Sequence, residues 1–178
     1  MKVGTTIVLG GVEQAICRAL ARFRHENNRK SGVHNAKMGG QSDWETDLEG
    51  IGAEFAFCKG FNLFPDFSIE IRSSQQGEDT GDAILPCGLR VDVKTTKYPT
   101  GRLLSVPWKK DCADVFALMV GVFPSYEFKG FMLFGELCRD GRLGDLGHGA
   151  TYIASQDELR SLEEILTQRG SNGGGDNV

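Results

Sequence analysis

Apolar side chains recur at helical spacing between residues 11 and 30, which predicts an amphipathic helix that docks through one face. The apolar positions are Val12, Ile16, Ala19, Leu20 and Phe23. The opposite face is basic, with a narrow stripe formed by Arg18, Arg22, His25 and Arg29. Two interpretations of this stripe are open: a solvated helix face, or a surface that contacts phosphates.

A second helix is predicted over residues 47–59, after a polar, glycine-containing loop over residues 31–46. Its packing face carries Leu48, Ile51, Phe55 and Cys58, while Gly52 and Ala56 allow close approach to a sheet. Glu54 lies inside this helix, between residues that pack. Gly60 is the expected end of the helix.

The pattern after this helix predicts strands separated by polar turns. They are expected at residues 67–72, 83–85, 89–96 and 102–106, with Pro86-Cys87-Gly88 closing a hairpin. The most apolar segment, residues 113–122, predicts a strand at the sheet centre, with residues 128–137 beside it. A short strand at residues 152–153 precedes a final helix, which Ser155 caps and which ends near Gln168. These elements predict an α/β protein.

Length and composition predict one domain over residues 1–170 and a disordered tail over residues 171–178, because 178 residues with 40% hydrophobic content supply one core. The hydrophobic runs stop short of the roughly 20 residues that cross a bilayer, and the start lacks the pattern of a signal peptide. We therefore expect a cytoplasmic protein without a membrane span. Five widely spaced cysteines without a CxxC pair predict buried free thiols.

Charge is distributed unevenly along the chain. The net charge of −4 argues against a protein that coats nucleic acid through bulk charge, yet residues 1–40 carry seven basic residues and two acids. A second basic group consists of Lys97, Arg102, Lys109 and Lys110. This group either contacts a phosphate backbone or consists of ordinary surface residues.

The candidate chemistry lies in the hairpin. Asp92 and Lys94 point to the same face of their strand, because strand side chains alternate. A lysine among apolar neighbours is costly unless an acid or a ligand compensates it, and the partner strand begins at a second acid, Asp82. Two neighbouring carboxylates that are open to solvent favour a hard divalent cation, and Mg²⁺ needs only one or two of them.

Several alternatives remain at this stage. The acid-x-lysine pattern is common, and Glu127-Phe128-Lys129 repeats it with Asp114 upstream. Asp92 and Lys94 alone also fit a salt bridge on a half-exposed sheet. Glu78 or Asp79 could take the place of Asp82, and Glu54 could be a solvated helix residue.

The motif resembles that of the PD-(D/E)XK nucleases. Gly81-Asp82 stands where that family has Pro-Asp, so the proline is missing here, and Asp92-Val93-Lys94 stands where it has (D/E)XK. The resemblance implies a restriction-endonuclease-like core with the order α-β-β-β-α-β and a central mixed sheet flanked by helices. It also implies that Asp82, Asp92, Glu54 and the Val93 carbonyl hold Mg²⁺, with Mn²⁺ as a substitute, while Lys94 positions the attacking water.

Over nearly its whole length the chain is also similar to small phage-encoded members of this superfamily. The function expected from these observations is metal-dependent hydrolysis of DNA with little sequence specificity, by either endonuclease or exonuclease action. A homodimer would allow both strands to be cut. The alternatives are a catalytically inactive nuclease-fold protein that binds nucleic acid or a host protein, and a purely structural partner protein without affinity for nucleic acid.

Overall fold

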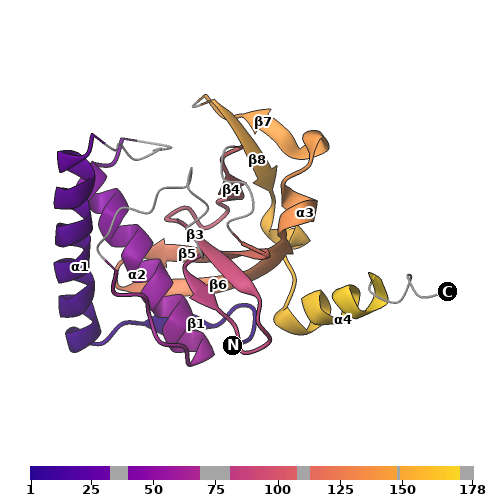
Figure 1. The fold of residues 1–178 in the computed structure, drawn as a ribbon, viewed down its shortest axis with the longest axis horizontal. Coiled ribbons are helices and arrows are strands. Elements are labelled where there is room, and N and C mark those ends of the chain that lie inside the picture. The colour runs from indigo at the N-terminus through magenta and orange to yellow at the C-terminus, as the bar shows by residue number, and fades with distance from the viewer. Residues whose placement is uncertain (33–39, 69–80, 108–112, 148, 173–178) are drawn as a thin grey trace.

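The computed structural model describes residues 1–32, 40–68, 81–107, 113–147 and 149–172. Within them the chain forms a five-stranded sheet, a three-stranded sheet and flanking helices (Figure 1). The helices are α1 (Gly11–Lys30), α2 (Asp43–Phe61), α3 (Phe134–Leu137), η1 (Asp140–Arg142), η2 (Gln156–Glu158) and α4 (Leu162–Asn172). The strands are β1 (Thr6–Val8), β2 (Ala83–Ile84), β3 (Arg90–Thr96), β4 (Leu103–Ser105), β5 (Val115–Val122), β6 (Ser125–Leu133), β7 (Leu143–Asp145) and β8 (Ala150–Ala154).

The large sheet has the order β1-β6-β5-β3-β2 and places β5 at its centre, as the apolar run predicted. Every residue from Val115 to Val120 is buried, because helices or the small sheet cover both faces. β5 runs parallel to β3 and antiparallel to β6, so the sheet is mixed. The predicted hairpin is confirmed, since β2 pairs with β3 in antiparallel register. The chain is therefore a mixed α/β protein.

The described order of elements differs from the order α-β-β-β-α-β. After α2 come β2 and β3, then β4 in the small sheet, and then β5 and β6 in the large one. Phe123-Pro124 joins β5 directly to β6, so no helix separates these two strands. The small sheet, of order β4-β8-β7, was not predicted, because its short strands alternate too little to be grouped from sequence.

Helix α1 lies beside α2, and α2 packs against the large sheet (Figure 1). α2 buries the predicted Leu48, Ile51, Phe55 and Cys58, but it begins at Asp43, inside the predicted loop. The reason is a capping box that we did not predict: Ser42 accepts from the amide of Glu45, whose carboxylate accepts from the amide of Ser42.

The predicted packing face of α1 is confirmed for Leu20, which is buried, and for Ile16, which packs against the core, but it was wrong at Val12 and Phe23. Val12 and Phe23 are exposed (77% and 51%), while α1 buries Cys17, Leu20 and Ala21 against its neighbours. The helix is rotated because Arg24 belongs to the packing face, where its guanidinium pairs with Glu54 of α2. Apolar periodicity alone could not place an arginine on that face.

The C-terminal part also differs from the prediction. The segment predicted as a strand over residues 128–137 begins earlier, at Ser125, and ends at Leu133, where α3 starts. The capping box at Ser155 begins only the short η2, and Ser161 with Glu164 caps α4 instead. α4 continues through Asn172, two residues into the predicted tail. Of the strand predicted over residues 67–72, Phe67 and Ser68 are not in a strand, and residues 69–72 lie outside the described residues. Residues 173–178 of the predicted tail also lie outside them.

The described cysteines are free thiols, as expected, but not all of them are buried. Cys17 and Cys58 are free and buried, and burial raises the pKa of each thiol to about 12. Cys87 is exposed, against the expectation of burial, because it lies in the β2–β3 turn. Among the described residues, no helix is long and apolar enough to cross a bilayer.

Gly52 lets α2 approach the β5–β6 turn closely. A Cβ atom at this position would lie 2.4 Å from the Tyr126 hydroxyl and 2.7 Å from the Phe123 ring. We expect Gly52→Ala to lower the free energy of unfolding by about 1–3 kcal/mol, because the core must shift. Gly50 of the same helix has open space around it, so Gly50→Ala should raise stability by about 0.5–1 kcal/mol. Urea unfolding of both variants tests this opposition, and equal effects would contradict it.

Candidate functional site

Asp82, the residue just before β2, lies against the middle of β3. Ala83 pairs with Val91, and the Asp82 amide donates to the Val91 carbonyl at 2.7 Å. The side chain of Asp82 also bonds to β3, because its Oδ2 atom accepts from the Val93 amide at 2.7 Å. The Asp82 carboxylate is therefore fixed beside Val93, the central residue of the Asp92-Val93-Lys94 motif.

Asp92 and Lys94 form an ion pair on one face of β3, as strand alternation predicted for their direction. The Asp92 side chain is 3% exposed and that of Lys94 is 23% exposed. The Lys94 Nζ atom also lies 5.8 Å from the centre of the Phe116 ring. The pair is thus sheltered rather than placed on a half-exposed surface, and the lysine keeps contact with solvent.

Burial and the neighbouring charged groups shift the pKa of Asp82. Burial raises the pKa of Asp82 to about 8, and the negative charges of Glu54 and Asp92 add to this rise. Lys94 and the Val93 amide oppose it by stabilising the carboxylate. The cluster therefore carries an excess of acidic groups that a cation would relieve.

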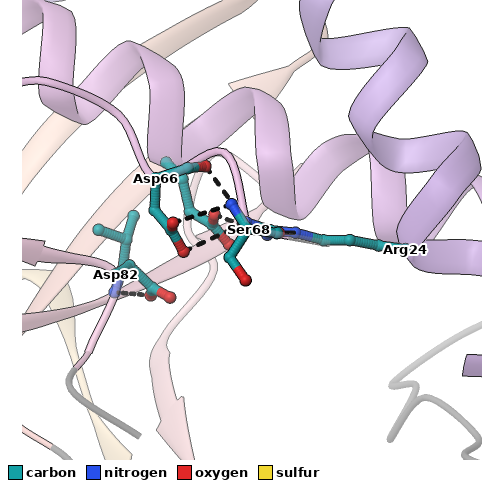
Figure 2. Close-up of polar contacts among 6 residues, drawn as sticks. Arg24, Asp66, Ser68 and Asp82 are labelled. Atoms are coloured by element: carbon teal, nitrogen blue, oxygen red, sulfur yellow. Dashed lines mark hydrogen bonds and ion pairs between the residues drawn. The ribbon is translucent and has the colours of Figure 1, made fainter. Parts of the chain in front are cut away.

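Glu54 faces α1 instead of solvent. Its Oε2 atom lies 3.0 Å from the Arg24 guanidinium, and both side chains are less than one-fifth exposed. Arg24 also donates to the Ser68 carbonyl at 2.9 Å and to the Asp66 carbonyl at 3.3 Å (Figure 2). One arginine therefore holds Glu54 and the segment after α2 in the part of the molecule that contains Asp82.

The carboxylates do not form a ready-made ion-binding group. Within the described ranges, no three side chains of His, Cys, Asp or Glu are close enough together to hold one metal ion. Asp92 has Lys94 as a partner, Glu54 has Arg24, and Asp82 accepts from the Val93 amide. Glu54 is thus coupled electrostatically to Asp82 while it is held by its own arginine. Glu78 and Asp79, the alternatives to Asp82, lie outside the described residues.

The raised pKa of Asp82 predicts a pH-dependent stability difference between the protein and its Asp82→Asn variant. The folded state holds this proton more tightly than the unfolded state, so the free energy of unfolding falls as pH rises from about 4 to about 8. Asparagine carries no charge, and the variant should gain stability relative to the unmodified protein across that window. Urea unfolding at several pH values tests this, and a difference independent of pH would contradict it.

The second acid-x-lysine pattern is assembled differently. Glu127 and Lys129 of β6 form an ion pair 2.6 Å long, but Asp114 lies at the other end of the β5–β6 ladder. There it accepts from the Arg90 amide and guanidinium, which lower its pKa against the effect of burial. The register of the sheet therefore keeps Asp114 away from Lys129, so this second pattern does not bring two acids and a lysine together.

The predicted phosphate-contacting residues fall into two groups. Those of α1 are engaged locally: Arg18 lies over the Phe123 ring, Arg22 pairs with Glu26, and Arg29 pairs with Asp43. Lys97 and Arg102, by contrast, line a cleft of about 750 Å³ that also includes Lys94. Lys109 and Lys110 lie outside the described residues.

Sequence reasoning missed several parts of this site. Arg24 was not singled out, because its partners Glu54 and Asp66 are distant in sequence and no local pattern joins them. Glu49 was missed for the same reason. Its carboxylate accepts from the Phe123 amide at 3.0 Å and from the Tyr126 hydroxyl at 2.9 Å, which fixes the β5–β6 turn against α2.

Comparison with known proteins gives a family without an assigned activity. The model of DUF5843, described as a family of unknown function, matches residues 1–133, which span β1 to β6 and include Asp82, Asp92 and Lys94. No curated protein and no solved structure matches the chain. Because the matched residues make up well over half of the sequence, this chain belongs to DUF5843, a family of unknown function.

Proposed function

We propose that this protein is a magnesium-dependent nuclease of the PD-(D/E)XK type, with a restriction-endonuclease-like core, that hydrolyses DNA with little sequence specificity. The observation that carries the proposal is that Asp82, just before β2, accepts from the Val93 amide, between the paired residues Asp92 and Lys94. Two acids and a lysine from neighbouring strands are the groups that such a reaction requires.

The donor set suits a hard divalent cation. Burial and the negative charges of Glu54 and Asp92 raise the pKa of Asp82, and a bound cation would lower it again. Asp82 and Asp92 would hold Mg²⁺ or Mn²⁺ together with the Val93 carbonyl, since magnesium takes one or two protein carboxylates and completes its shell with water and phosphate oxygens. When bound, the cation would polarise the phosphate and lower the pKa of a water molecule. Glu54, which pairs with Arg24, would contribute to the site through the effect of its negative charge on Asp82.

The residues of the chain have distinct tasks in this scheme. Lys94 reaches both the Asp92 carboxylate and the cleft, so its ammonium can orient a water molecule and stabilise charge on the phosphate oxygens. The Val93 amide holds Asp82 in place through its hydrogen bond. Asp92, almost fully buried, fixes the direction of the Lys94 side chain through their ion pair.

Incubation of supercoiled plasmid and single-stranded DNA with Mg²⁺, Mn²⁺ or EDTA tests the proposal. We expect breakdown of DNA in either metal and none in EDTA. Contamination is controlled by a parallel preparation of the Asp82→Asn, Asp92→Asn double variant. Cleavage that survives EDTA, or that the double variant retains, would reject the assignment.

A catalytically inactive nuclease-fold protein that binds nucleic acid or another protein is the second candidate. It is favoured by the pairing of Asp92 with Lys94 and of Glu54 with Arg24, because each of these acids already has a cation of the chain as its partner. This candidate predicts DNA binding without cleavage in Mg²⁺ or Mn²⁺, and binding that Lys94→Ala leaves unchanged.

A further inference from the structure

A cleft lined by residues from several elements lies beside Lys94. It has a volume of about 750 Å³ and follows the C-terminal half of β3 and the loop to β4, with α2 and the small sheet completing its walls. Asp82 and Asp92 are not among its lining residues. Its volume lies within the range of about 300–1,000 Å³ that is common for ligand sites.

The charge of the cleft favours an anion. Among the described residues that line it, Lys94, Lys97 and Arg102 are basic and Glu49 is the one acid. The Glu49 carboxylate is already occupied, because it accepts from the Phe123 amide and the Tyr126 hydroxyl. Lys94 is paired with Asp92, so Lys97 and Arg102 are the cations that act on the cleft with little opposing charge, which suits phosphates.

Two hydroxyl groups of the cleft walls have no hydrogen-bond partner in the described part of the chain. Ser105 is 2% exposed, and neither its Oγ atom nor the buried Oγ1 atom of Thr95 makes a hydrogen bond in the described residues. A buried polar atom without a partner costs about 1–3 kcal/mol, so such atoms are rare in folded proteins. Both residues line the basic cleft, so its walls contain polar groups as well as cations.

An aromatic ring lies next to the cations. Tyr98 lines the cleft and is 55% exposed, and the Lys97 Nζ atom lies 5.6 Å from the centre of its ring. Basic grooves that contain an exposed aromatic face are typical of proteins that bind single strands, because every unpaired base can stack on such a ring.

We propose that this cleft binds a single strand of nucleic acid, with phosphates at Lys97 and Arg102 and a base against Tyr98. A duplex keeps its bases stacked inside, so it cannot offer one to Tyr98, and a cleft of this size accommodates a few nucleotides of one strand. The inference rests on the proposed function and deepens it, because it names single-stranded nucleic acid as the substrate that reaches Lys94.

Fluorescence anisotropy in EDTA tests the inference without any cleavage. The probes are a labelled octathymidylate and a blunt hairpin duplex with a matched number of phosphates. We expect the single strand to bind about tenfold more tightly than the duplex or better. Arg102→Gln should weaken single-strand binding by about fivefold or more and reduce the slope of log K against log salt by about 0.7.

Two further variants separate stacking from charge. Tyr98→Ala should weaken binding of the single strand by about fivefold or more while leaving the salt slope unchanged. Arg169→Gln removes an exposed arginine of α4, which does not line the cleft, and should change binding less than about twofold. Equal affinity for duplex and single strand, or Arg102→Gln and Tyr98→Ala variants that behave like Arg169→Gln, would overturn the inference.

A parallel cleavage assay in Mg²⁺ distinguishes the two proposals. Binding that depends on the cleft, without cleavage of either probe, rejects the nuclease and leaves the single-strand site standing. Cleavage of both probes at equal rates, unaffected by Arg102→Gln, supports the nuclease and rejects the single-strand site.

Discussion

Asp92→Asn is expected to lower the rate of DNA cleavage by about 10³-fold or more while the protein remains folded. The substitution keeps the shape of the side chain but removes the charge that would hold the cation. It also removes the carboxylate that pairs with Lys94, so the ammonium loses its fixed direction. Initial rates on supercoiled plasmid measure the effect, and circular dichroism with thermal unfolding checks the fold.

Glu127→Gln is the matched control, because Glu127 also forms an ion pair with the lysine two residues ahead on its strand. Its side chain is 36% exposed, and Asp82 does not lie beside it in the sheet. This variant should cleave DNA within about twofold of the unmodified protein, since the loss of a partly exposed pair is worth less than about 1 kcal/mol. A loss of activity in Glu127→Gln, or near-normal activity in Asp92→Asn, would contradict the assignment.

Arg24→Met is expected to lower the free energy of unfolding by about 3 kcal/mol, the second large effect. Methionine keeps much of the packing volume but leaves Glu54 as a sheltered charge without its cation. It also leaves the Asp66 and Ser68 carbonyls without their donor. For a chain of this length the midpoint of thermal unfolding should fall by about 6–12 °C.

Arg22→Met tests whether the loss of stability comes from the partly buried contacts of Arg24. Arg22 lies on the same helix and pairs with Glu26, but the two side chains are 75% and 43% exposed. Its replacement should change stability by less than about 0.5 kcal/mol, because exposed helix pairs contribute little. Similar losses in the two variants would mean that Arg24 contributes no more than a surface arginine.

The large elements of the fold could be predicted because each has a strong local signal. The span of α1, the β2–β3 hairpin and the central place of β5 follow from periodicity, a Pro-Cys-Gly turn and a continuous apolar run. The rotation of α1 could not be predicted, because Arg24 of its packing face forms a partly buried ion pair with Glu54, which is distant in sequence. The three-stranded sheet depends likewise on pairing between strands that are far apart in sequence.

The candidate site was predictable in its core but not in its surroundings. Strand alternation placed Asp92 and Lys94 on one face, and the hairpin placed Asp82 near them. The partner of Glu54 could not be read from the sequence, since a glutamate inside a helix has no pattern that names a distant arginine. The cleft at Lys97 and Arg102 was equally hidden, because its walls come from α2, β3, β4 and the small sheet.

Titration with Mn²⁺, followed by the loss of the free-ion signal in electron paramagnetic resonance, tests the central claim most directly. The account predicts one saturable site per chain that Asp82→Asn and Asp92→Asn each weaken about tenfold or more, whereas Glu127→Gln leaves it intact. Absence of saturable binding, or binding that both aspartate variants retain in full, would contradict the claim that these two carboxylates hold a cation beside Lys94.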